Sequence, residues 1–200
     1  MNLVYKDNLE AYTPIVLDLI SQCNMVSIDT EFSGLGNPKL NRQPNIQDRY
    51  IGLKSTVEEH SLLALGLSIF SKGSVYNFHF LMYSMADFKI SSASIAFLAK
   101  NNFDFNFLFR NGILLDRSNR NPYLLKIWKS LFNRLLVVHN GWLDLMYLYS
   151  FLYADLPAEL GSFIADLDDM FRHGIFDTKY IADFEYREKA SFLAYLFGKW

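Results

Sequence analysis

Two carboxylates one residue apart, Asp29 and Glu31, follow an apolar run in the stretch MVSIDTEFSGLG, residues 25–36. Residues two apart on a β-strand point to the same face, so both acids would project together from the end of a buried strand. Like charges this close raise each other's pKa unless a cation compensates. Carboxylate oxygens favour a hard ion such as Mg²⁺, which Mn²⁺ can replace. The spacing indicates a divalent-metal site, although a solvated strand end would carry the same pattern.

A third acid, Asp144, occurs in VVHNGWLDLMYLY, residues 137–149, where it would lie in the first turn of a helix. The helix dipole favours an ionised carboxylate at that position, which leaves Asp144 able to bind metal. Taken alone, Asp144 is equally an ordinary acid at the start of an amphipathic helix.

The apolar spacing predicts the elements that would position these acids. Helices are predicted at residues 9–20, 46–59, 94–101, 122–133, 142–153, 161–171 and 191–200, and strands at 25–29, 61–70, 74–83, 135–138 and 175–177. Asn8 is placed to cap the first helix. A hairpin followed by alternating strands and helices predicts an α/β fold with a mixed sheet flanked by helices.

Composition limits the class of protein. The chain has 200 residues, of which 51% are hydrophobic, and we expect one domain over residues 1–200. A net charge of -2 gives no overall basic field for a nucleic acid, although a local patch would suffice, and residues 110–134 carry six basic side chains against one acid. Cys23 is the only cysteine, and no stretch reads as a signal peptide or membrane span. We therefore expect an intracellular protein without membrane contact.

Several motifs, in a fixed order, resemble a known nuclease family. They are IDTEFSGLG (28–36), RYIGLKSTVEEHSLLALGLSIF (49–70), FDFNFLFRNGI (103–113), VVHNGWLDLMYLYSFLYADLP (137–157) and GIFDTKY (174–180). The chain resembles the DEDD exonuclease superfamily, in the deadenylase branch of the poly(A)-specific ribonucleases (PARN) and the nuclear target-of-EGR (TOE) deadenylases. Residues 114–134 leave no room for the RNA-binding domain inserted in the former, so the TOE group resembles this chain more closely.

This resemblance implies an RNase H-like fold and a 3′–5′ exoribonuclease that trims the poly(A) ends of RNA. Asp29, Glu31 and Asp144 would be ligands of two Mg²⁺ ions, with Mn²⁺ as a substitute. The nuclear relatives imply processing of small noncoding RNA and a nuclear location.

The resemblance also implies contacts with the RNA. Phe32 and Ser33 would touch the terminal nucleotide, although core packing is an equal alternative for Phe32. His139 and Asn140 could approach the phosphate, while Asn140 could instead cap the following helix. Asp177 is expected to support the site or to cap the helix after it.

One part of the family pattern is missing. The fourth acid and a general-base histidine come from a later H-x-x-x-x-D motif, but only His139 has an Asp five positions on, and that residue is Asp144. We therefore expect a truncated chain that lacks the C-terminal part of the fold, exposes apolar surface and can self-associate. The alternative to an exoribonuclease is a catalytically incomplete RNA-binding or scaffold protein.

Overall fold

The computed structural model describes residues 2–40 and 42–199. Within them, seven strands form one mixed sheet in the order β1-β4-β3-β2-β6-β7, with β5 paired to β4. The strands are β1 (Asn2–Val4), β2 (Met25–Phe32), β3 (Leu62–Ser71), β4 (Ser74–Ser84), β5 (Ile113–Leu115), β6 (Leu135–Val138) and β7 (Ile175–Asp177). Strands β2, β3 and β4 are antiparallel, whereas β6 and β7 continue the sheet in parallel. The predicted mixed α/β sheet is confirmed.

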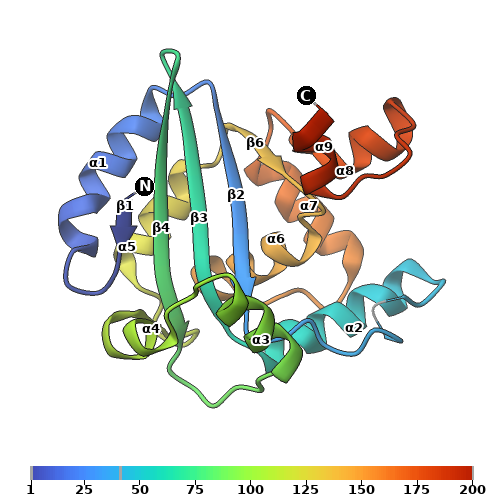
Figure 1. Cartoon of the computed structure of the whole chain (residues 1–200), viewed down its shortest axis with the longest axis horizontal. Helices are drawn as coiled ribbons and strands as arrows, with labels where there is room; N and C mark the ends of the chain where they lie inside the picture. Colours follow the sequence, from blue (N-terminus) through green and yellow to red (C-terminus); the bar gives the residue numbers. More distant parts are fainter. Residues whose placement is uncertain (1, 41, 200) are drawn as a thin grey trace.

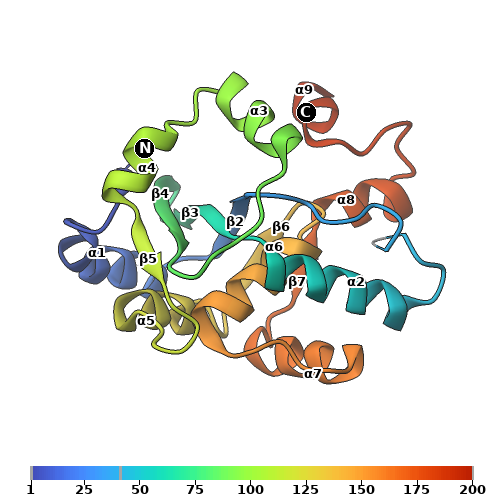
Figure 2. The same cartoon turned by 90° about the horizontal axis from the view of Figure 1, so that it is seen from below.

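Helices flank the sheet on both sides (Figures 1 and 2). They are α1 (Leu9–Ser21), α2 (Ile46–Glu59), α3 (Ser92–Lys100), α4 (Phe105–Asn111), α5 (Pro122–Ser130), α6 (Trp142–Leu148), α7 (Leu160–Met170), α8 (Thr178–Tyr180) and α9 (Leu193–Lys199). Helices α1 and α5 lie on one side of the sheet, and α3 and α4 cross one end of the other side. In the described residues, no helix is long and apolar enough to span a membrane.

Strand alternation decides which side chains face the core. In β2, the side chains of Val26, Ile28 and Thr30 are buried, while Asp29 between them is exposed. Strands β3 and β4 bury the same side with alternate residues of one core cluster: Leu65, Leu67, Ile69, Phe78, Phe80 and Met82. Asp29 and Glu31 therefore lie on the opposite side of the sheet from its main core.

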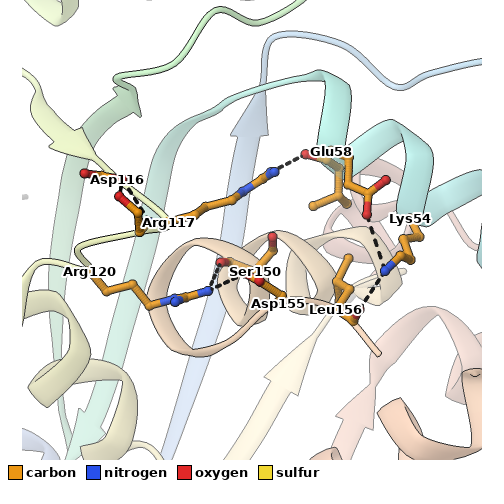
Figure 3. Close-up of polar contacts among 10 residues, drawn as sticks. Lys54, Glu58, Asp116, Arg117, Arg120, Ser150, Asp155 and Leu156 are labelled. Carbon is orange, nitrogen blue, oxygen red and sulfur yellow. Dashed lines mark hydrogen bonds and ion pairs between the residues drawn. The ribbon is translucent and has the colours of Figure 1, made fainter. Parts of the chain in front are cut away.

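Basic side chains tie helix α2 to the turn that follows α6, as Figure 3 shows. Lys54 of α2 donates to the carbonyl of Leu156 at 2.7 Å. Arg117 donates to the carbonyl of Val57, and its guanidinium lies 4.2 Å from the ring centroid of Phe151. Lys54 and Arg117, the second of which belongs to the basic segment 110–134, thus make contacts within the protein. Their charges are not part of a free basic patch for nucleic acid.

Several local predictions need correction. Strand β2 extends to Phe32, so both acids lie within the strand, and the predicted helix at 142–153 ends in a π-helical turn, Tyr149–Tyr153. Asn8 does not cap α1, because its side chain accepts from the N–H of Tyr5 at 2.8 Å and donates to Leu3. The last predicted helix is present as α9, and Trp200 lies outside the described residues.

Candidate active site

Strand β2 and helix α6 bring three acids together. Strand β6 pairs with β2 only through Met25, Val26 and Ser27. Helix α6, which follows β6, can therefore approach the later part of the β2 edge. There the hydroxyl of Thr30 donates to Oδ1 of Asp144 at 2.6 Å, and Asp144 is only 8% exposed. This hydrogen bond fixes the third acid to the strand that carries Asp29 and Glu31.

The three acids interact electrostatically. Burial, followed by the negative charges of Asp29 and Asp144, raises the pKa of Glu31 to about 7. The pKa of Asp144 is raised to about 6, mainly by burial and also by the charge of Asp29, which together outweigh the lowering effect of the Thr30 hydrogen bond. Asp29 keeps an exposed side chain, but the protein around it removes part of its solvent and raises its pKa, while the Thr30 N–H and the charge of a protonated His139 lower it. A cation would relieve this mutual repulsion.

The donor set matches the chemistry of a hard divalent ion. Carboxylate oxygens are the ligands that Mg²⁺ and Mn²⁺ prefer, and the raised pKa values of these acids are what a positive charge would lower. Within residues 2–40 and 42–199, no three His, Cys, Asp or Glu side chains already form a metal-binding cluster. The three carboxylates match a divalent cation in the kind of ligand atom and in their negative charge. The number of bound ions stays a prediction.

Asp177 holds the start of α6. Its carboxylate accepts hydrogen bonds from the backbone N–H groups of Asn140 at 2.9 Å and Gly141 at 3.1 Å, and also caps α8 through Lys179 at 2.9 Å. Asn140 has a φ of 57°, and no side chain caps α6. The expectation that Asn140 caps α6 is therefore wrong, because the carboxylate of Asp177 satisfies backbone N–H groups at this junction.

Gly141 lets α6 begin directly behind β6. A Cβ atom on Gly141 would lie 2.4 Å from Cβ of Val138. We expect Gly141→Ala to shift α6 and to lower the free energy of unfolding by about 1–3 kcal/mol, measured by urea denaturation. Gly161→Ala, in open space on α7, is the matched control and should be neutral or stabilising. Equal stabilities of the two variants would contradict this account of the junction.

His139 has a defined tautomer in its neutral form. The hydroxyl of Thr178 donates its only proton to the carbonyl of Val138 at 3.1 Å, so it accepts from Nδ1 of His139 at 2.9 Å. Nε2 of His139 is then an unprotonated acceptor. When the ring is protonated, its positive charge lowers the pKa of Asp29, so His139 lies close to the acids.

The two residues after Glu31 have different environments. The ring of Phe32 stacks on Tyr147 at a centroid distance of 4.2 Å and packs against the main core. Ser33 is fully buried, and its hydroxyl donates to the carbonyl of Lys89 at 2.7 Å and accepts from the N–H of Ser61 at 2.9 Å. The expectation that the Ser33 side chain touches a nucleotide is therefore wrong, because this buried hydroxyl already makes its hydrogen bonds with backbone groups of the protein.

Thr30 and Thr178 were not predicted as site residues. Thr30 stands between the two acids in the sequence, but strand alternation turns it to the other face, where it meets Asp144. Thr178 follows Asp177 and meets His139 across β6 and β7. In the sequence, the position of each threonine next to a predicted site acid, in D-T-E and in F-D-T-K, was the only sign that it could belong to the site. The residues that they contact, Asp144 and His139, become known only from the tertiary fold.

The raised pKa of Glu31 predicts a pH-dependent stability. Folding takes up a proton between the ordinary pKa of 4.5 and about 7, so stability should fall as the pH rises through this window. Glu31→Gln should flatten that slope, leaving the smaller part that the raised pKa values of Asp144 and Asp29 contribute, and should stabilise the protein at pH 8 by about 1–2 kcal/mol, after a discount for solvent screening. Urea denaturation at pH 5 and pH 8 in EDTA measures both values. A variant that keeps the wild-type slope would rule out this assignment.

Comparisons with known proteins identify the family of the chain. The model of the CAF1 family ribonucleases matches residues 4–134 and 123–200. The chain is 32% identical over 116 residues to the probable CCR4-associated factor 1 homolog 5 of Arabidopsis thaliana, covering 55% of this chain and 40% of that protein. It is 31% identical over 129 residues to the poly(A)-specific ribonuclease PARN of Xenopus laevis, covering 55% and 20% respectively. The chain thus spans less than half the length of these relatives.

Solved structures share the fold. The S. pombe Pop2p structure in its Mg²⁺- and Mn²⁺-bound form superimposes with a TM-score of 0.77 at 21% identity, covering 94% of this chain and 77% of that chain. A chain in the structure of the yeast NOT1 MIF4G domain co-crystallized with CAF1 gives a TM-score of 0.73 at 18% identity, covering 99% of this chain and 77% of that chain. These neighbours confirm the expected RNase H-like fold. With a family match over nearly all of its residues, the chain belongs to the CAF1 family of ribonucleases.

Proposed function

We propose that this chain is a divalent-metal-dependent 3′–5′ exoribonuclease that removes adenosines from RNA 3′ ends. The observation that carries the proposal is the electrostatic coupling of Asp29, Glu31 and Asp144 on a chain of the CAF1 family. The similarity to a poly(A)-specific ribonuclease supports adenosine-rich RNA as the substrate.

Asp29, Glu31 and Asp144 would hold the ions, two in our proposal. Bound Mg²⁺ or Mn²⁺ activates water and stabilises a departing oxygen in phosphodiester hydrolysis. The protein itself supplies two positioning contacts: Thr30 orients Asp144, and Thr178 directs the Nδ1 proton of His139. Nε2 of His139 is left able to accept a proton from water.

We further propose that residues 1–200 act as one domain of the TOE type, with small nuclear RNA 3′ ends among its substrates and a nuclear location. Support comes from the short connection between β5 and α5, residues 116–121, which holds no inserted domain. Self-association is part of the same proposal, because apolar side chains such as Phe184, Phe192 and Phe197 are exposed.

A second candidate function is RNA binding without catalysis. It is favoured by the finding that the described residues hold no ready-made cluster of three metal-binding side chains. In that case the three acids would not catalyse hydrolysis of the bound RNA, and the chain would act as a scaffold.

The test uses the 200-residue chain and a 5′-labelled RNA with an oligo(A) 3′ end. We expect a ladder of products, each one nucleotide shorter, with Mg²⁺ or Mn²⁺, and no ladder with EDTA, with Asp29→Asn or with a 3′-phosphorylated RNA. A matching DNA oligonucleotide tests the sugar preference. RNA binding without any ladder in either metal would overturn the exonuclease and favour the scaffold.

A further inference from the structure

A glycine lies in the middle of the sheet, beside the candidate active site. In the strand register, Gly66 of β3 is paired with Asp29 of β2 on one side and with His79 of β4 on the other. Directly paired residues project from the same face of a sheet. Two strand spacings separate Asp29 from His79, a span of about 10 Å. We call this row, Asp29, Gly66 and His79, the Gly66 notch.

Neither backbone conformation nor packing requires glycine at position 66. Its φ is not positive, and the pairing of β3 with both neighbours shows no irregularity there. A Cβ atom would meet only the carbonyl oxygen of Asp29, at an ordinary 3.6 Å. Glycine weakens the interior of a strand, and it often marks a bulge, a tight bend or the close approach of another backbone or of a ligand. Gly66 shows no bulge, and only the carbonyl of its paired strand lies within 4 Å of a Cβ there, which leaves a ligand as the reason that we infer.

The far side of the notch carries an imidazole without a protein partner. His79 is half-buried, and burial lowers its pKa, so the ring is neutral at physiological pH. Among the described residues, no hydrogen bond or ion pair engages this ring. A neutral imidazole offers one donor and one acceptor, and both are available to a ligand.

The surface around the notch is uncovered and mostly polar, with the exposed Leu3 of β1 beside His79 as its apolar member. The next row of the same face holds Ser27, Ser68 and Asn77, and the hydroxyl of Ser68 lies 2.7 Å from Oδ1 of Asn77. The apolar residues of this face, including Leu63 and Leu81, are packed under α3 and α4 at one end. Figure 1 shows no helix in front of the middle of β3 and β4. The uncovered strip therefore runs from the acids across the glycine to His79.

We propose that a nucleotide of the RNA substrate lies over Gly66, between Asp29 and His79, and that the imidazole of His79 hydrogen-bonds to its ribose. This inference rests on the proposed function, since it places the substrate of the same site. A ring with both a donor and an acceptor suits a 2′-hydroxyl, the group that distinguishes RNA from DNA. In this arrangement His79 binds the substrate, and the missing side chain at Gly66 leaves room for the ribose.

The test fills the notch without disturbing the fold. Gly66→Val adds bulk where there is room, and valine favours strands, so its Tm should equal or exceed that of the wild type. We expect about a tenfold loss of trimming of oligo(A) RNA, with weaker oligo(A) binding in EDTA measured by fluorescence anisotropy. An unchanged Mn²⁺-induced rise in Tm would show that the acids are undisturbed. Ser74→Val, at the far end of β4, is the matched control and should keep wild-type activity.

His79 is tested on its own. His79→Ala should weaken binding of oligo(A) RNA more than binding of the DNA of the same sequence, and His79→Gln should recover part of the loss. The inference is overturned if folded Gly66→Val binds and trims like the wild type. If the wild type binds oligo(A) but does not trim it, the exonuclease proposal fails alone, and weaker binding by Gly66→Val still supports the notch. If the wild type does neither, both are overturned.

Discussion

Replacing Asp144 with asparagine is expected to lower 3′-end trimming by about 10³-fold while leaving the fold at least as stable. The change is nearly isosteric, and the amide oxygen can still accept the Thr30 hydrogen bond, so α6 should stay in place. What is lost is the negative charge that would help to hold the ions. Because burial raises the pKa of Asp144 to about 6, the neutral amide also avoids the cost of a buried charge at neutral pH.

Single-turnover trimming and urea denaturation on the same samples separate these two effects. Asp168→Asn, an exposed acid on α7, is the matched control and should change neither quantity. An Asp144→Asn protein that is stable and trims at the wild-type rate would remove Asp144 from the active site.

Trp128→Ala should produce the largest loss of stability, about 3–5 kcal/mol, which is a large part of the stability of a typical domain. Trp128 is 1% exposed and packs edge-to-face against Phe132 and Phe171, at 6.0 Å and 5.6 Å between ring centroids. Alanine would leave a cavity where α5 meets the segment after α7. Urea denaturation measures the loss, and activity should fall with the folded fraction.

Trp128→Phe separates packing from hydrogen bonding. The indole Nε1 is buried without a partner among the described residues, so its removal costs no hydrogen bond and offsets part of the lost contact. We expect a loss well below that of Trp128→Ala. Equal losses in the two variants would show that ring packing does not hold this part of the core.

Local patterns predicted the elements whose partners lie nearby or whose periodicity is long. Helix α2 and strand β6 have the predicted bounds, and the hairpin of β3 and β4 turns through Lys72 and Gly73, both with positive φ. Strands β1 and β5 were not predicted, because each has three residues and gains its structure from parallel pairing with β4, far away in the sequence. Helix α4 was not predicted either, although its residues carried part of the family resemblance.

The candidate site shows the same division. The spacing of Asp29 and Glu31 predicted a shared face, and the structure adds the contact that brings Asp144 to them. The preference for asparagine at a helix N-cap suggested Asn140 as the cap of α6. In the structure, the backbone N–H of Asn140 instead bonds to Asp177, which lies 37 residues further along the chain. Ser33 followed the acids in sequence, but its burial removes it from the surface. Contacts between distant segments decide these roles, and local spacing carries no information about them.

The most direct test of the central claim, that Asp29, Glu31 and Asp144 act as one divalent-metal site, is a calorimetric Mn²⁺ titration of the 200-residue chain. Asp29→Asn and Asp168→Asn are titrated beside it. We predict that the wild type and Asp168→Asn bind Mn²⁺ in competition with Mg²⁺, and that Asp29→Asn binds at least about tenfold more weakly. No binding by the wild type, or equal binding by Asp29→Asn, would contradict the claim.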